Sequence, residues 1–215
     1  MPELTRRTML GTAGGLVLLP WSKSPATAAH DQPAAAVPPP IFTAIPYLQP
    51  GSDGPTGMVV AWQTDNRPCR FLVEVDEIGP VVPERTERMT DDDGELRWNY
   101  AARIRGLTPG RKYRYRVLAD DRAIAEGWFT ADKPRGTKTR FVAFGDNSYG
   151  DISDRMNAYQ AWKLRPDFVM NTGDNVYPEG TDSQYARMFF PVYNADEAGP
   201  RIGAPLLRSV PFYTV

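Results

Sequence analysis

The stretch RFVAFGDNSYGDISDRMNAYQAWKLRPDFVMNTGDNVY (residues 140–177) decides the fold of the second part of this chain. It contains two apolar runs, and each run is followed directly by Gly-Asp. Between the runs, apolar residues recur at helical spacing, and Asp151 or Ser153 is placed to cap the start of a helix. Pro166 marks the end of that helix. The order strand, helix, strand predicts a βαβ unit with two parallel strands.

The spacing and the apolar character of residues in this stretch support the assignment of its helix and its first strand. Ile152, Met156, Tyr159 and Trp162 recur at helical spacing, so we expect them to share one face of the helix. The first strand, residues 140–144, is a continuous apolar run. Such a run is typical of a strand that is covered on both faces.

The two Gly-Asp pairs are the candidate functional residues. The carboxyl ends of parallel strands meet at one edge of a sheet, where ligands bind in open α/β sheets, so Asp146 and Asp174 could aim at a common volume. Two carboxylates on a dry site repel each other unless a cation lies between them. The preceding glycine allows a sharp turn, and Tyr177 can fold back as a phenolate ligand to ferric iron. One Gly-Asp pair alone is a common turn; the repetition indicates a metal site.

Residues 41–132, which precede this stretch, alternate between polar and apolar residues at a period of two. Residues 57–64, with Met58, Val60 and Trp62 on one face, read as a strand. Residues 111–117 read as a half-buried antiparallel strand whose basic side chains face water. Asp91-Asp92-Asp93-Gly94 reads as a surface turn without the further ligands of a calcium loop. About seven strands in this length fit a β-sandwich.

The pattern of the first 40 residues predicts an export signal followed by a linker. Arg6-Arg7 stands just before a short apolar run, residues 10–20, and Ala26-Thr27-Ala28 fits a signal peptidase site. Residues 1–28 therefore resemble a twin-arginine export signal. An ordinary secretory signal or a disordered basic tail remains an alternative. Residues 29–40 are rich in proline and alanine and predict an extended linker.

The overall composition excludes several classes of function. Lys and Arg number 25 against 26 Asp and Glu, so no strong field attracts nucleic acid, and we expect no nucleic-acid partner. The apolar run near the N-terminus is too short to be a stable membrane anchor. Cys69 is the single cysteine, and a disulfide framework is thereby excluded. His30 is the single histidine and lies in the expected linker, so these residues cannot supply a site built from several imidazoles.

Gly173-Asp174-Asn175-Val176-Tyr177 resembles the Gly-Asp-x-x-Tyr motif of the purple acid phosphatases, in the calcineurin-like metallophosphoesterase superfamily. Gly145-Asp146 resembles the motif that precedes it, although Ser148 stands where the family usually has glycine. An early tryptophan strand and the later Leu-x-Pro-Gly-x-x-Tyr-x-Tyr pattern, residues 107–115, resemble a fibronectin type III sandwich. The resemblance implies an all-β fibronectin type III-like sandwich (41–132) followed by an incomplete α/β metallophosphoesterase domain (139–215).

The resemblance also implies roles for the site residues. Asp146 would bind the first metal, Asp174 would bridge both metals, and Tyr177 would bind the first metal as a phenolate. The cofactor would be a dinuclear centre of Fe with Zn, Mn or Fe. In the family, a strand like residues 211–215 leads into histidine-containing metal motifs, so the chain reads as truncated before them. We therefore expect the 215 residues alone to be inactive.

The sequence thus predicts a metal-dependent phosphoric ester hydrolase of the acid phosphatase type that acts on phosphate monoesters. A diester, a nucleotide or a phospholipid head group remains open as the substrate. The alternative is a secreted fibronectin-type binding module with a vestigial, inactive catalytic tail. In either case we expect the twin-arginine export machinery as a partner and a periplasmic or extracellular location in a bacterium. The oligomeric state is left open.

Overall fold

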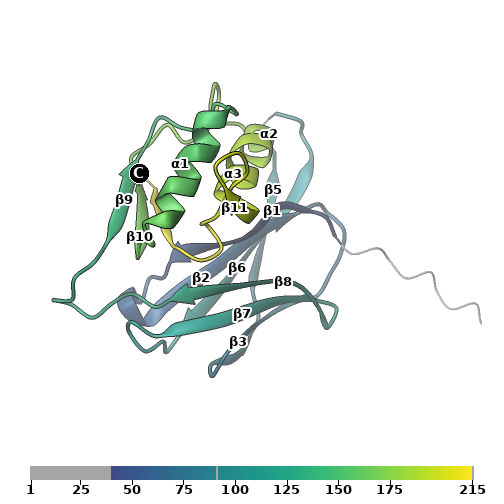
Figure 1. Ribbon diagram of the computed structural model, residues 1–215. Coiled ribbons are helices and arrows are strands. Elements are labelled where there is room, and N and C mark those ends of the chain that lie inside the picture. The colour runs from purple at the N-terminus through teal and green to yellow at the C-terminus, as the bar shows by residue number, and fades with distance from the viewer. Residues whose placement is uncertain (1–39, 91, 215) are drawn as a thin grey trace, which may run out of the picture. The chain divides into compact units, whose positions relative to one another are not determined.

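Residues 42–130 form a β-sandwich of two four-stranded antiparallel sheets (Figure 1). This computed structural model describes residues 40–90 and 92–214, so the expected export signal, His30 and nearly all of the linker lie outside the described residues. The first sheet has the order β1 (Phe42–Pro50), β2 (Gly57–Thr64), β6 (Leu96–Arg105) and β5 (Glu84–Met89). The second has the order β4 (Gly79–Val81), β3 (Phe71–Val75), β7 (Lys112–Ala119) and β8 (Arg122–Thr130). The expected sandwich is confirmed. A short 3-10 turn, η1 (Gly54–Thr56), precedes β2.

Trp62 lies in the core between the two sheets. Its ring stacks on Tyr100 at 5.2 Å between ring centroids and meets Phe71 edge-on at 5.3 Å. Met58 and Val60 are buried in the same core, as the period-two alternation predicts. Aromatic pairs of this kind add stabilisation beyond the area they bury.

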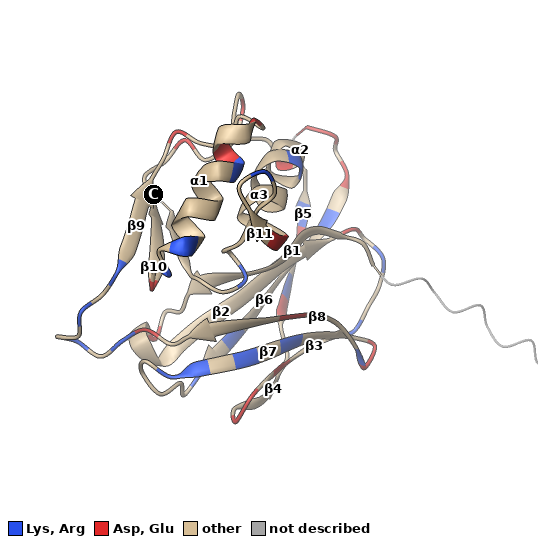
Figure 2. Cartoon of the chain, in the orientation of Figure 1, with Lys and Arg blue, Asp and Glu red and all other residues tan. Residues whose placement is uncertain are grey.

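Strand β7 follows the predicted alternation along most of its length. Tyr115 is buried in the sandwich core, whereas Arg114 pairs with Glu126 and Arg116 pairs with Glu74 on the outer face. In Figure 2 the positions of the basic residues of this strand are blue segments of the β7 ribbon. These surface ion pairs contribute little to stability. The interpretation of the basic residues as a solvated sheet face is confirmed. The acidic stretch near residue 92 is also a turn, as predicted.

The segment after the sandwich contains a small parallel sheet. Its strand order is β13 (Phe212–Thr214), β10 (Phe168–Asn171) and β9 (Phe141–Phe144), and both pairings are parallel. Helix α1 (Ile152–Lys163) joins β9 to β10, so the predicted βαβ unit is confirmed. Asp151 caps the helix, because its side chain accepts hydrogen bonds from the backbone of Ser153 and Asp154. The remaining elements are α2 (Asp182–Gln184), the π-helical turn η2 (Tyr185–Phe189), α3 (Phe190–Tyr193), β11 (Asn194–Gly199) and β12 (Gly203–Pro205).

The expectation that residues 140–144 are covered on both faces is wrong. Phe141 is 54% exposed, and Met170 on β10 is 38% exposed on the same face of the sheet. Val169 and Phe212 point to the other face and are buried. Within the described residues, α1 and its neighbours cover only that second face (Figure 1). The apolar run is therefore continuous although only one of its faces is packed.

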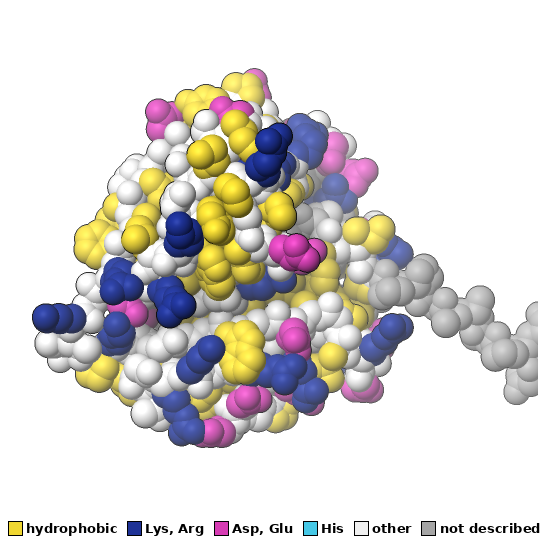
Figure 3. Space-filling view, viewed as in Figure 1, with side chains coloured by type: hydrophobic (Ala, Val, Ile, Leu, Met, Phe, Trp, Pro, Cys, Tyr) yellow, Lys and Arg dark blue, Asp and Glu magenta, His cyan; other side chains and the backbone are white. Residues whose placement is uncertain are grey.

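The large apolar residues that recur at helical spacing do not form the buried face of α1. Ile152 and Met156 are each 46% exposed, whereas Asp154, Ala158 and Ala161 are buried. On the side of the molecule seen in Figure 3, apolar side chains gather over the region of α1. Through these small residues the helix packs closely against β12, β11 and α3, because alanine lets neighbouring backbones come close. Spacing alone could not show this, since the larger apolar side chains also recur at helical intervals.

The two parts of the described chain are joined by specific polar contacts. The Leu48 amide of β1 donates to the Leu207 carbonyl at 2.8 Å, and the Tyr115 hydroxyl donates to the Arg208 carbonyl at 3.0 Å. Buried Asn194 donates to the Pro46 carbonyl at 3.0 Å. Val59 and Ala61 on β2, which face away from the sandwich core, are consequently buried as well. Every helix of the described residues is too short or too polar to cross a membrane.

Candidate metal centre

The two Gly-Asp pairs lie side by side at one edge of the parallel sheet. Strands β9 and β10 are in register with Phe144 opposite Asn171. Pairing continues beyond the strands, because the Asp146 amide donates to the Gly173 carbonyl at 3.2 Å and the Asn147 amide donates to the Asp174 carbonyl at 3.0 Å. The prediction that parallel strands bring these two loops together is confirmed.

The backbone of both loops is unusual. Asp146 has φ 55° and Asp174 has φ 49°, in the left-handed region that non-glycine residues seldom adopt. Only glycine fits at position 145, because a Cβ there would lie 2.5 Å from Thr172 Oγ1 and 2.8 Å from the Gly173 carbonyl oxygen. Strained residues that recur at one place are typical of functional sites. The two aspartates are therefore held in a conformation that the surrounding contacts impose.

Tyr177 folds back onto the first Gly-Asp loop, as the sequence suggests. Its hydroxyl donates to Asp146 Oδ1 at 2.6 Å. Tyr149 donates to the same oxygen at 2.6 Å, and the two phenol rings stack with 4.3 Å between their centroids. Sequence analysis missed Tyr149; its place three residues after Asp146 was the available signal. Asp146 Oδ1 thus accepts hydrogen bonds from two phenol groups that belong to two different loops.

These hydrogen bonds change the acid–base properties of all three groups. The hydrogen bonds from Tyr149 and Tyr177 lower the pKa of Asp146, because they favour its ionised form. The hydrogen bond to Asp146 raises the pKa of Tyr149 and also raises that of Tyr177. Both phenols are consequently protonated at neutral pH. A metal ion that binds a phenolate here would have to release a proton.

Buried hydrogen bonds to Asp154 stabilise the loop that carries Asp146. Asp154 of α1 is 3% exposed and accepts hydrogen bonds from the amides of Ser148 (2.9 Å), Gly150 (2.9 Å) and Asp151 (3.3 Å). These bonds fix the loop that carries Asp146 and Tyr149. Sequence analysis missed Asp154, because an aspartate three residues after a helix cap is usually an exposed end of a capping box.

Two buried asparagines link the loops to each other. The Asn171 carboxamide donates to Asn147 Oδ1 at 3.1 Å, and the Asn147 carboxamide donates to the Asn175 carbonyl at 3.3 Å. Asn171 Oδ1 in turn accepts from the Gly173 amide at 3.1 Å. Both Gly-Asp pairs are followed by asparagine, so the repeated Gly-Asp-Asn was the signal for this network.

The donor set at this edge fits a hard cation. Asp146, Asp174 and Tyr177 present carboxylate and phenol oxygens, which are the donors that hard ions prefer. Both aspartates are exposed in the part of the chain that the structure describes. Within residues 40–90 and 92–214, no three of the His, Cys, Asp and Glu side chains gather closely enough to hold a metal ion. Three oxygen ligands fit part of a metal shell.

Comparison with known proteins gives one family match. Residues 45–142 match the family model described as the purple acid phosphatase N-terminal domain. This range contains all strands from β2 to β8 and most of β1. No curated protein matches the chain significantly.

Three of the solved structures that align with parts of this chain have TM-scores below 0.5. A structure titled "Structure of PhoD" aligns over 82% of this chain at 16% identity and a TM-score of 0.48, and the chain spans 40% of that protein's length. The sensor domain of the anti-sigma factor RsgI4 from Pseudobacteroides cellulosolvens aligns over 45% of this chain and 96% of its own, at 14% identity and a TM-score of 0.30. Amylomaltase from Corynebacterium glutamicum aligns over 60% of this chain and 22% of its own, at 17% identity and a TM-score of 0.26.

Proposed function

We propose that this protein is a metal-dependent phosphoric ester hydrolase of the acid phosphatase type, or a part of one. Its residues 45–142 match the family model of the purple acid phosphatase N-terminal domain. The observation that carries the proposal is the pair of hydrogen-bonded Gly-Asp loops, with Asp146 and Asp174 at one sheet edge and Tyr177 folded onto Asp146. The sandwich is then related to fibronectin type III domains, and the substrate is a phosphate monoester.

In this proposal each of the three residues holds metal. Asp146 and Tyr177 would hold the first ion of a dinuclear centre of Fe with Zn, Mn or Fe, and Asp174 would be a ligand to both ions. The ions would supply Lewis acidity for the phosphoryl group. The chain's own part is orientation, since Asp154 fixes the loop that carries Asp146 through three backbone hydrogen bonds. Tyr149, which donates to Asp146 Oδ1, competes with metal for that oxygen.

A ferric titration of the full chain tests the metal assignment. We expect Fe(III) to produce a visible phenolate-to-iron absorption band, because Tyr177 lies against the Asp146 carboxylate. Tyr177→Phe is expected to lose the band. Tyr149→Phe is the matched control, because it removes the other phenol on the same oxygen and should keep the band. Absence of the band in the unmodified chain, or its survival in Tyr177→Phe, would contradict the assignment.

We also propose that the protein is exported through the twin-arginine machinery to the periplasm or the cell exterior. The support is the order of Arg6-Arg7, the short apolar run and Ala26-Thr27-Ala28. In a bacterial host, mass spectrometry of the exported protein should find an N-terminus at Ala29. The double substitution Arg6→Lys with Arg7→Lys should retain the precursor inside the cell, whereas Lys23→Gln should not. Unchanged export of the double variant would exclude this route.

A further inference from the structure

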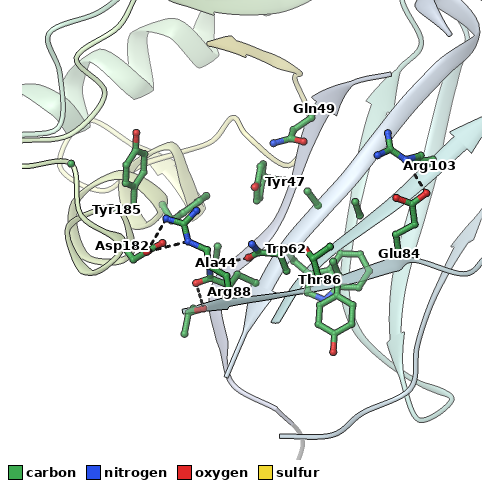
Figure 4. A pocket seen from close by; sticks show the side chains of 18 residues that line it. Ala44, Tyr47, Gln49, Trp62, Glu84, Thr86, Arg88, Arg103, Asp182 and Tyr185 are labelled. Carbon is green, nitrogen blue, oxygen red and sulfur yellow. Dashed lines mark hydrogen bonds and ion pairs between the residues drawn. The ribbon is translucent and has the colours of Figure 1, made fainter. Parts of the chain in front are cut away.

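A hollow on the outer face of the sheet β1-β2-β6-β5 is not used by the proposed reaction. It has a volume of about 620 Å³ and lies between this sheet and residues 180–190 (Figure 4). That volume is within the range of small-molecule sites. Neither Asp146 nor Asp174 is among the residues that line it, so the hollow is separate from the candidate metal centre.

The strand register explains why the hollow exists. Across the four strands, one row of side chains on the outer face reads Tyr47, Ala61, Ala101 and Glu84, because Tyr47 pairs with Ala61, Ala61 with Ala101, and Ala101 with Glu84. The two alanines are central and the two large side chains stand at the flanks. The small side chains of Ala61 and Ala101 consequently form an apolar floor, and the aromatic side chain of Tyr47 stands at one side of it.

The next row along the strands is polar and uncharged. Thr43 donates to Gln63 Oε1 at 2.7 Å, and the Gln63 carboxamide donates to Asn99 Oδ1 at 2.9 Å. Thr86 stands opposite Asn99 on β5. Among the described residues, the carboxamide nitrogen of Asn99 and the hydroxyl of Thr86 have no further side-chain partner, so both can hydrogen-bond a ligand.

The charged residues of the hollow neutralise one another. Arg103 pairs with Glu84 at 3.1 Å, and Arg88 pairs with Asp182 at 2.9 Å. Figure 4 shows the first pair on one side of the hollow and the second pair on the other. The lining therefore carries two positive and two negative side chains. Because these charges balance, the lining offers no net charge to attract an ionic ligand, and this favours a neutral ligand.

We propose that this hollow binds a neutral saccharide. A sugar ring has apolar C–H faces and a rim of hydroxyl groups. The alanine floor and Tyr47 match the apolar faces, and the side chains of Gln63, Asn99 and Thr86 match the hydroxyl rim. Arg103 donates to Glu84 Oε1, so the second carboxylate oxygen of Glu84 can add an acceptor. A glycan site on the sandwich would give the protein a binding function in addition to its reaction.

Titration of the isotope-labelled full chain with neutral sugars tests this proposal by NMR. The probes are glucose, galactose, N-acetylglucosamine, maltose and cellobiose, with glucuronic acid and inorganic phosphate as charged comparators. We expect at least one neutral sugar to cause saturable shifts at the backbone amides of Tyr47, Ala61 and Ala101. No saturable shift with any neutral sugar, or tighter binding of glucuronic acid or phosphate at these amides, would overturn the proposal.

Two variants separate the hollow from the rest of the surface. Ala101→Leu fills the floor and should weaken sugar binding by at least about tenfold. Thr86 lies on the exposed strand β5, so Thr86→Ala removes one hydroxyl without disturbing the core. This variant should weaken sugar binding by about threefold. Thr130→Ala is the matched control, because Thr130 is exposed on the edge strand β8 of the other sheet and should bind as before. Equal binding by Thr86→Ala and Thr130→Ala, with folding of each confirmed by circular dichroism, would refute the site.

Discussion

Gly203→Ala is expected to reduce the free energy of unfolding by at least about 3 kcal/mol. Gly203 opens β12 with φ 114°, a conformation that L side chains rarely adopt. A Cβ at this position would lie 2.1 Å from the Val192 carbonyl oxygen and 2.9 Å from its carbon. These are backbone atoms at the buried end of α3, so no side-chain rotation can relieve the contact. Substitution must shift α3 or the hairpin β11–β12.

Urea unfolding followed by circular dichroism measures this effect, and Gly79→Ala is the matched control. Gly79 also has a positive φ, 93°, but a Cβ added there would have no atom within 4 Å. It should therefore show only the conformational cost, about 1–2 kcal/mol. The difference between the two variants isolates the contact with Val192. Equal midpoints for the two variants would show that α3 and the hairpin are not packed as described.

Asp154→Ala is expected to cost about 3 kcal/mol of stability and to impair metal binding. Its buried carboxylate accepts hydrogen bonds from three backbone amides, which would lose their partner together. The Ser148 amide is the most affected, because Ser148 is fully buried and water cannot replace the bond. Asp154 is a positioning residue, since it fixes the loop that carries Asp146 and Tyr149. Thermal unfolding and the ferric titration together measure the two effects.

Asp151→Ala is the control for Asp154→Ala. Asp151 caps the same helix through bonds to the amides of Ser153 (2.7 Å) and Asp154 (3.3 Å), but it is exposed. Loss of the cap should cost about 1 kcal/mol and leave the ferric band unchanged. If Asp154→Ala loses stability but retains the full ferric affinity, Asp154 supports the fold and does not position the metal ligands.

The candidate site was predictable in part because its main residues follow a local rule. An apolar run that ends in Gly-Asp can be recognised from its own residues, and two parallel strands must end at the same edge. Asp146 and Asp174 were found in this way, and Tyr177 was found by its place three residues beyond Asp174. The structure brings Asp146 and Tyr177 into contact. Tyr149 and Asp154 were missed, since their roles depend on a loop that turns back onto the helix start.

Burial in α1 and β9 also depends on more than the local pattern. Ile152 and Met156 have the right spacing for a buried stripe, but α1 packs through Ala158 and Ala161. A helix can be rotated about its axis without changing its sequence pattern, and the neighbouring elements β12, β11 and α3 decide the rotation. Phe141 was expected to be covered for the same reason: its apolar character was visible, but the layers around its strand were not.

By itself the sequence determined the period-two strands of the sandwich, the βαβ unit and the two Gly-Asp pairs, because each depends on residues close together in the chain. The tertiary structure alone decided which side chains meet across the strands. The alanines of the hollow, Ala61 and Ala101, lie 40 residues apart in the sequence and become neighbours only through the register of β2 and β6. Register and helix rotation are set by the packing of whole layers, and local sequence patterns leave both undetermined.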